Sequence, residues 1–309
     1  MTDSLPDVVP GSGLPERVQI WEVGARDGLQ NESEIVPAAV KIELVERLAA
    51  AGLSIIEVTS FVRPDWVPQL ADAVEVIAGI DRRPGVRYPV LVPNLRGLDR
   101  ARESAVTDIA VFASATETFA QRNLNRAVDT QMEMFAPVIA GARESGMRVR
   151  GYVSMCFGDP WEGRVPRAQV VSVCRELFDA GCDAISLGDT IGVATPGQVT
   201  ALLADLVASG IPVSAIGVHF HDTYGQALAN TYAALQAGVT TVDSSAGGLG
   251  GCPYAKSATG NLATEDLVWM LDGLGIETGV DLAALVATSR WLADRMGRPS
   301  PSRVVRALG

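Results

Sequence analysis

The chain has 309 residues, with 25 Lys and Arg against 36 Asp and Glu, which gives a formal net charge of −11. Hydrophobic residues make up 48% and charged residues 20%, a composition that excludes a disordered chain and is typical of a globular one. The acidic balance argues against nucleic acid or an anionic membrane surface as a partner, because both need a basic footprint. No uninterrupted apolar run of about 18 residues occurs, so we expect no membrane span.

The N-terminal residues 1–16 are polar and rich in Pro and Gly, and they lack a basic segment followed by an apolar run. They indicate a flexible tail rather than a signal peptide. The cysteines are sparse and show no CxxC spacing, which argues against a disulfide framework and favours a reducing, cytoplasmic location. They are Cys156, Cys174, Cys182 and Cys252.

Short β-branched runs alternate along the chain with longer segments of helical period. We expect eight strands, at 18–23, 54–59, 87–92, 108–113, 148–154, 184–187, 215–220 and 240–244. We expect helices between them, at 37–51, 72–80, 98–104, 129–145, 167–180, 196–209 and 224–237. Several of these helices end in Ala-Gly or Ser-Gly, a pairing that suits a helix C-terminus.

Eight strand–helix units in about 250 residues match a (β/α)₈ TIM barrel, an α/β fold. The alternative is a doubly wound open sheet, since both folds have this periodicity. Polar residues at the strand ends favour the barrel, because a barrel gathers eight such ends into one mouth. They are Arg26, Asp27, Glu57, Asn94, Ser114, Tyr152, Asp189, His219 and His221.

We therefore expect a single barrel domain over 17–309, with two or three additional helices from about 261. Ser114 and Tyr152, at the ends of the fourth and fifth strands, are expected to contact a substrate in the mouth. Glu57 and Asp189 need partners there, because a carboxylate inside a barrel mouth is costly to leave unpaired.

Both histidines of the chain lie in the motif His219-Phe220-His221-Asp222 at the end of the seventh strand. Residues i and i+2 of a strand face the same side, so the two imidazoles converge. Such a pair suits a divalent metal ion, although two core histidines that only donate hydrogen bonds would give the same pattern.

The motif Arg26-Asp27-Gly28 follows the first strand directly. Its carboxylate can serve as a third metal ligand, and its guanidinium can hold a carbonyl or carboxylate of a substrate. A surface ion pair beside a glycine turn is the alternative interpretation. A set of two His and one Asp with open positions favours Mg²⁺ or Mn²⁺, with Zn²⁺ as a further candidate.

Four of the five residues from 247 to 251 are glycines, and Cys252 follows them. This composition indicates a mobile loop that can close as a lid, with Gly248, Gly250 and Gly251 as its lid residues. Cys252 could act there as a general acid or base. The alternatives are phosphate binding by backbone N–H groups, or an incidental cysteine.

In combination, these motifs closely resemble those of the hydroxymethylglutaryl-CoA lyases, metal-dependent lyases built on a TIM barrel. The matching segments are Glu22–Glu32, Thr59–Val62, Trp66–Gln69, Ser186–Gly192, His219–Ala227, Gly247–Ala255 and Gly260–Asp266. The resemblance implies a set of ligands for Mg²⁺ or Mn²⁺, which are Asp27, His219, His221 and Asn261.

The resemblance also implies catalytic roles. Arg26 would neutralise charge on the thioester oxygen, and Cys252 would be the catalytic thiol. Glu57 and Asp189 would orient Arg26 and the ligands. The implied reaction is retro-Claisen cleavage of 3-hydroxy-3-methylglutaryl-CoA to acetyl-CoA and acetoacetate. Barrels of this family are commonly dimers, so a homo-oligomer is expected by analogy.

Two departures bear on the acyl group. Ser33 stands where these lyases usually carry Lys, and the segment 155–161 is bulkier than usual. They leave open a related lyase for citramalyl-CoA or for a longer branched 3-hydroxyacyl-CoA. A condensing synthase or aldolase of the same superfamily is a further alternative, as is a catalytically silent protein that binds CoA or metal.

Overall fold

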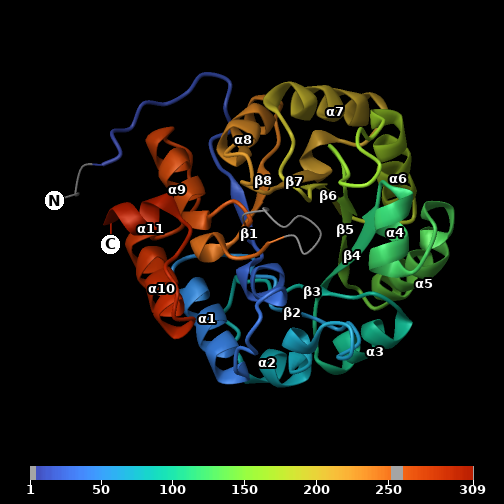
Figure 1. Ribbon diagram of the computed structural model, residues 1–309, viewed down its shortest axis with the longest axis horizontal. Helices are drawn as coiled ribbons and strands as arrows, with labels where there is room; N and C mark the ends of the chain where they lie inside the picture. The colour runs from blue at the N-terminus through green and yellow to red at the C-terminus, as the bar shows by residue number, and fades with distance from the viewer. Residues whose placement is uncertain (1–4, 252–259, 309) are drawn as a thin grey trace.

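The computed structural model describes residues 5–251 and 260–308, and Figure 1 shows a ring of strands surrounded by helices. Within these ranges eight parallel strands form one sheet, in the order β1-β8-β7-β6-β5-β4-β3-β2. They are β1 (Gln19–Glu22), β2 (Thr59–Ser60), β3 (Val90–Leu91), β4 (Asp108–Ser114), β5 (Arg148–Ser154), β6 (Ala184–Asp189), β7 (Ile216–Phe220) and β8 (Thr241–Ser244).

Backbone hydrogen bonds join the two ends of this sheet. The Glu22 N–H donates to the Ile55 carbonyl over 3.1 Å, and the Glu57 N–H donates to the Glu22 carbonyl over 2.8 Å. The residues just before β2 therefore pair with β1, which confirms the predicted barrel.

Helices cover the outside of the barrel, and α9 to α11 form a group beside α1 and α8 (Figure 1). The α-helices of the described ranges are α1 (Ala38–Ala50), α2 (Ala73–Gly79), α3 (Leu95–Glu103), α4 (Glu117–Leu124), α5 (Gln131–Glu144), α6 (Arg167–Asp179), α7 (Pro196–Ala208), α8 (Ala227–Gln236), α9 (Thr264–Gly273), α10 (Leu282–Arg295) and α11 (Arg303–Leu308). None of the helices in these ranges is long and apolar enough to cross a membrane.

The predicted strands and helices are all present, but one helix was missed. Helix α4 is short, and its sequence ETFAQRNL buries only Phe119, Ala120 and Leu124, too brief a pattern to separate from a loop. The second and third strands are shorter than predicted, because the segments 54–58 and 87–89 pair through single bridges and backbone hydrogen bonds instead.

The N-terminal segment before β1 lies along the end of α9. The Val9 N–H donates to the Gly273 carbonyl over 2.9 Å, and Arg17 pairs with Glu277 over 2.6 Å. The division of the chain into a tail over 1–16 and one domain over 17–309 stays a prediction.

The main core lies between the barrel and its helices, and Phe135 of α5 lies within it with no exposed surface. Its ring centroid is 5.8 Å from that of Phe112 on β4. Replacing Phe135 by Ala should lower the free energy of unfolding by about 3–5 kcal/mol, because it removes buried area and leaves a cavity. Urea unfolding followed by circular dichroism measures this. Val74→Ala is the control, since Val74 is 49% exposed, and equal losses in both variants would contradict the assignment of this core.

Candidate active site

A single π-helical turn, η1 (Gly24–Gly28), follows β1 and carries Arg26 and Asp27 to the barrel mouth. The turn is closed by the Gly28 N–H, which donates to the Val23 carbonyl over 3.1 Å. Such turns are rare and frequently occur at functional sites. Here the turn aims two successive side chains at the same cavity, which an extended strand would send to opposite faces.

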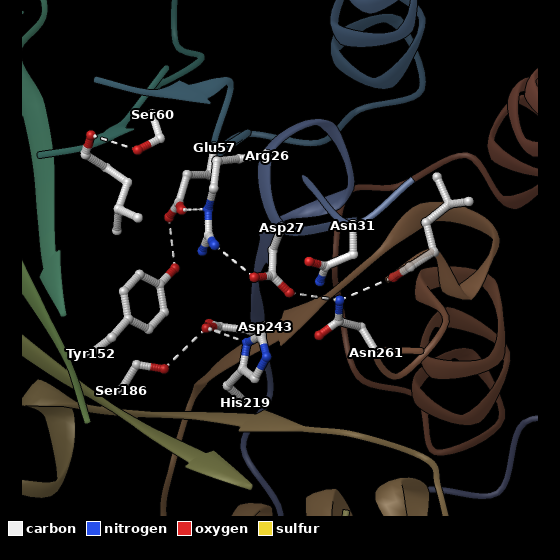
Figure 2. Close-up of polar contacts among 12 residues, drawn as sticks. Arg26, Asp27, Asn31, Glu57, Ser60, Tyr152, Ser186, His219, Asp243 and Asn261 are labelled. Atoms are coloured by element: carbon white, nitrogen blue, oxygen red, sulfur yellow. Dashed lines mark hydrogen bonds and ion pairs between the residues drawn. The ribbon is translucent and has the colours of Figure 1, made fainter. Parts of the chain in front are cut away.

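Arg26 is buried and held between two carboxylates (Figure 2). Its Nε donates to Glu57 Oε1 over 2.5 Å, and its Nη1 donates to Asp27 Oδ1 over 2.6 Å. The other oxygen of Glu57 accepts from the Tyr152 hydroxyl over 2.6 Å and from Trp21 Nε1 over 2.9 Å. Glu57 therefore fixes the guanidinium and the phenol together, so both present a fixed geometry to the cavity.

Asp27, His219 and His221 form the candidate metal site. One ligand atom from each lies within 4.8 Å of the others, and the two imidazole centroids are 5.3 Å apart. Asn261 joins them because its backbone forms a bridge with His221, and its Nδ2 donates to Asp27 Oδ2 over 2.9 Å. The predicted ligand set is thus brought together from β7, the turn after β1 and the segment before α9.

Two buried atoms of this group have no hydrogen-bond partner: Nδ1 of His221 and Oδ1 of Asn261. A buried polar atom without a partner is costly, so these atoms suggest a ligand that they would contact. Imidazole nitrogen, carboxylate and amide oxygen are together a suitable donor set for a divalent cation. The residues present therefore fit a metal ion.

The charge states of His221 and Asp27 suit the same role. Burial, followed by the charge of the His219 ring, lowers the pKa of His221 to about 4, so its imidazole is neutral near pH 7. Burial acts to raise the pKa of Asp27, but Arg26 and the two imidazoles outweigh it and hold it well below its ordinary value. A neutral imidazole and an ionised carboxylate are the forms that bind a metal ion.

The site opens into a cavity of about 610 Å³, within the usual range for small-molecule pockets. Its polar side carries Arg26, Asp27 and the two histidines, and Arg63 and Arg122 also line it. Apolar side chains from β4, α4, α5 and the end of β5 also line it and are called its apolar side; they are Phe112, Phe119, Leu124, Met134 and Val153. Further apolar lining comes from Val62, Trp66, Val67, Pro68, Leu91 and Pro93.

Comparison with known proteins identifies the family. The model of the HMGL-like family matches residues 17–292, which is most of the chain. The chain belongs to the HMGL-like family.

Curated relatives of this HMGL-like chain carry lyase names. It is 52% identical to the rat protein named 3-hydroxy-3-methylglutaryl-CoA lyase, cytoplasmic, over 96% of this chain and 86% of the relative. It is 53% identical to the Pseudomonas aeruginosa protein named 3-hydroxy-3-isohexenylglutaryl-CoA/hydroxy-methylglutaryl-CoA lyase, over 96% and 98% of the two chains. The solved structure of hydroxymethylglutaryl-CoA lyase from Pseudomonas aeruginosa superposes with a TM-score of 0.93 at 52% identity, covering 96% of this chain and 98% of that one.

Not all residues predicted for the site of this HMGL-like protein face the cavity. Ser114 does not line it. The Ser114 hydroxyl donates to the Thr116 carbonyl over 2.9 Å and accepts from the Thr116 N–H over 3.0 Å, so it stabilises the turn before α4. The substrate role predicted for Ser114 has no support from its position, whereas Ser154, its register partner on β5, lines the cavity.

Asp189 also differs from its predicted contacts. Its carboxylate accepts from the N–H groups of Val193 and Ala194 over 2.9 and 3.1 Å, and not from Arg26. Burial raises the pKa of Asp189 to about 6. Asp189 thus shapes the loop after β6, whereas Glu57 does contact Arg26 as expected.

The two departures noted in the sequence lie away from the cavity. Ser33 is exposed, and neither Ser33 nor the segment 155–161 lines the main cavity. Their bearing on the acyl group stays a prediction, without direct contact with this cavity. Trp161 has an indirect link, since the guanidinium of Arg122, which lines the cavity, lies 4.5 Å from its ring centroid.

The described part of the glycine segment is tied to the barrel. The 3₁₀ turn η5 (Ala246–Gly248) follows β8, and the Leu249 carbonyl accepts from Asn261 Nδ2 over 3.0 Å. Gly250 has a φ of +114°, and a Cβ there would lie 2.5 Å from the same Nδ2, so only glycine fits. Gly251 lines the cavity, and the predicted catalytic Cys252 lies outside the described residues.

Sequence reasoning missed two buried carboxylic acids beneath this turn. Glu22 accepts from the N–H groups of Gly24 and Ala246, each over 2.8 Å. Glu265 accepts from the Gly247 N–H over 2.9 Å and from the Ser289 hydroxyl. They connect η5 to β1, α9 and α10. Both lie in segments that match the family motifs, but their contacts to η5 depend on residues distant in sequence, 224 positions away for Glu22 and Ala246.

Burial raises the pKa of Glu265 to about 8 and that of Glu22 to about 7. In the folded protein these groups hold a proton that an unfolded chain would lose near pH 4.5. Their contribution to stability is therefore fully present below that pH and is lost as the pH rises through about 7 to 8.

Glu265→Gln should flatten this decline by a few kcal/mol, since one pKa unit corresponds to about 1.4 kcal/mol. Urea unfolding at a series of pH values from 5 to 9 measures how the free energy of unfolding changes with pH. Part of the decline should remain in the variant, because Glu22 still titrates there. Glu277→Gln, at an exposed surface ion pair, is the control. A slope unchanged by Glu265→Gln would show that this carboxyl does not titrate in that range.

Proposed function

We propose that this protein cleaves 3-hydroxy-3-methylglutaryl-CoA to acetyl-CoA and acetoacetate. One observation carries the proposal: a fixed arginine and a candidate metal site share one cavity, in a chain about half identical to proteins named as lyases of this substrate. The condensing synthases and the catalytically silent protein are not favoured by any feature of the site.

Asp27, His219, His221 and Asn261 would hold a divalent ion, with Mg²⁺ or Mn²⁺ proposed from the oxygen and imidazole donors. When bound, such an ion supplies Lewis-acid polarisation of substrate oxygens and lowers the pKa of a coordinated hydroxyl.

Arg26 stabilises the negative charge that appears on the thioester oxygen when the C2–C3 bond of the substrate breaks. Its Nε and Nη1 are held by Glu57 and Asp27, so the guanidinium needs no rearrangement during the reaction. A single prearranged donor of this kind is worth about 3–4 kcal/mol of barrier lowering. Glu57 is therefore proposed as a positioning residue for Arg26, and Tyr152, which lines the cavity, as a substrate contact.

We propose Cys252 as the group that returns a proton to C2 of the released acetyl-CoA enolate. Support comes from its neighbour, because Gly251 lines the cavity and its carbonyl accepts from Asn31 Nδ2 over 2.8 Å. The lid function of Gly248, Gly250 and Gly251 belongs to the same proposal.

Cellular location and assembly follow by analogy. One rat relative is named cytoplasmic and another rat relative is named mitochondrial, and we propose a cytoplasmic location with a homo-oligomeric, dimeric assembly. The partner is a small acyl-CoA, and neither nucleic acid nor a membrane is proposed as a partner.

His221→Ala should remove one metal ligand and reduce kcat/KM for 3-hydroxy-3-methylglutaryl-CoA by at least about 100-fold, as at other metal sites whose ligand shell is damaged. Coupled assay of acetoacetate release and Mn²⁺ calorimetry measure both effects. The fold should persist, because the Nδ1 of His221 makes no hydrogen bond in the free protein. A folded variant that cleaves at the wild-type rate would sink the proposal.

A second candidate substrate is favoured by the apolar side of the cavity. Phe112 is the one residue of β4 that is not buried, and with Phe119 and Met134 it lines that side of the cavity. A 53% identical relative is named for both a methyl and an isohexenyl substituent. We infer that this protein also cleaves 3-hydroxyglutaryl-CoA esters with a longer apolar C3 substituent.

Phe112→Trp should fill the apolar side and lower kcat/KM for a longer C3 substituent by more than about tenfold, since a few buried methylenes are worth 1–3 kcal/mol. Cleavage of the methyl substrate should change by less than about threefold. Ser33→Lys is the control and should leave the ratio of the two values unchanged, because Ser33 does not line the cavity. A wild-type protein that cleaves only the methyl substrate would refute this second activity.

A further inference from the structure

Asp243 of β8 connects the candidate metal site to the interior of the barrel. Its buried carboxylate accepts from the Ser186 hydroxyl over 3.0 Å, and the same Oδ2 lies 3.3 Å from Nδ1 of His219, its register partner on β7 (Figure 2). A carboxylate has no hydrogen to offer, so a neutral His219 must donate from Nδ1. Its Nε2 then keeps the lone pair that a metal ion needs.

Arg150 of β5 holds the other oxygen of Asp243. Its Nη2 donates to Asp243 Oδ1 over 2.6 Å, and the two side chains are 2% and 0% exposed. The guanidinium carbon lies 4.1 Å from the ring centroid of Trp21 and 5.0 Å from that of Tyr152. These contacts fix Arg150 in one position, and with it the plane of the Asp243 carboxylate.

The neighbouring strand leaves room for this guanidinium. A Cβ on Gly217 of β7 would lie 2.5 Å from Arg150 Nη2. Gly217 lies two positions before His219 on the same strand. Any larger residue at position 217 would displace the guanidinium from Asp243. The space is therefore shaped around Arg150.

A purely structural ion pair would explain these contacts less well. Two buried charges lose so much hydration that apolar residues of similar volume are often as stable or more so. Arg150 also contacts the ring of Tyr152, whose hydroxyl donates to Glu57, the residue that holds Arg26. One buried cation thus supports both the metal side and the arginine side of the site.

We propose that Arg150 is a positioning residue for the metal site. It orients Asp243, and Asp243 holds His219 as the Nδ1–H tautomer, so that Nε2 is the ligand atom. The inference rests on the proposed metal site, and it assigns the task of preparing His219 to a residue that does not itself touch metal or substrate.

The first test reads the tautomer in the metal-free protein. The chain contains two histidines, so ¹⁵N-histidine NMR of tag-free protein at alkaline pH shows two imidazoles, assigned with His221→Ala. We expect His219 to carry its proton on Nδ1 in the wild type, and Arg150→Met to give a mixture or the Nε2–H form. A wild-type His219 protonated on Nε2 would overturn the inference without any variant.

The second test measures Mn²⁺ affinity by calorimetry without substrate. Arg150→Met should weaken binding by roughly 10–100-fold, the usual effect of losing a residue that orients a metal ligand. Arg150→Lys, which keeps the charge, should recover part of this loss. Arg148→Met is the matched control, because Arg148 lies on the same strand and pairs with Asp108 instead, over 2.6 Å, and it should leave the affinity unchanged.

The outcomes separate the two proposals. Wild-type protein that binds no divalent ion would overturn the metal site, and the positioning role with it. Wild-type protein that binds Mn²⁺, together with a folded Arg150→Met variant of equal affinity and unchanged tautomer, would overturn the positioning role alone. An Arg148→Met variant whose Mn²⁺ affinity falls as much as that of Arg150→Met would also overturn the positioning role alone. If Arg150→Met does not fold, the wild-type tautomer and the Arg150→Lys affinity decide.

Discussion

The site depends on the pairing of buried charges inside the barrel mouth. Arg26 lies between Glu57 and Asp27, and Arg150 pairs with Asp243. A buried charge without a partner would cost several kcal/mol. Each side chain is therefore confined to the position in which it contacts its partner. That confinement gives a fixed guanidinium and a fixed His219 imidazole in a protein whose overall charge is −11.

The rest of the fold supplies the positions. The segment before β2 and the strands β5 and β7 bring Glu57, Tyr152 and His219 together, and a π-helical turn adds Arg26 and Asp27. The C-terminal helices also serve the site, because Glu265 at the start of α9 holds the turn after β8.

How much of the site the sequence could predict depends on how far apart the contacting residues lie along the chain. His219 and His221 are two residues apart on one strand, so their convergence could be predicted from the period of a strand alone. Arg150 and Asp243 are 93 residues apart, and their contact depends on strand register that no local pattern shows. The backbone contacts of the Ser114 hydroxyl could not be predicted, because polarity at a strand end does not reveal whether a hydroxyl faces the cavity or its own backbone. Helix α4 was missed because its apolar face is too short. The apolar lining that this helix contributes to the pocket could therefore not be predicted.

The central claim is a metal-dependent cleavage carried out at this one mouth. The most direct measurement is product formation from 3-hydroxy-3-methylglutaryl-CoA by the chelator-treated protein, titrated with Mg²⁺ or Mn²⁺. We expect no cleavage without the ion, and acetyl-CoA and acetoacetate in equal amounts once it is added. Cleavage that persists after complete metal removal, or no cleavage with either ion, would contradict it.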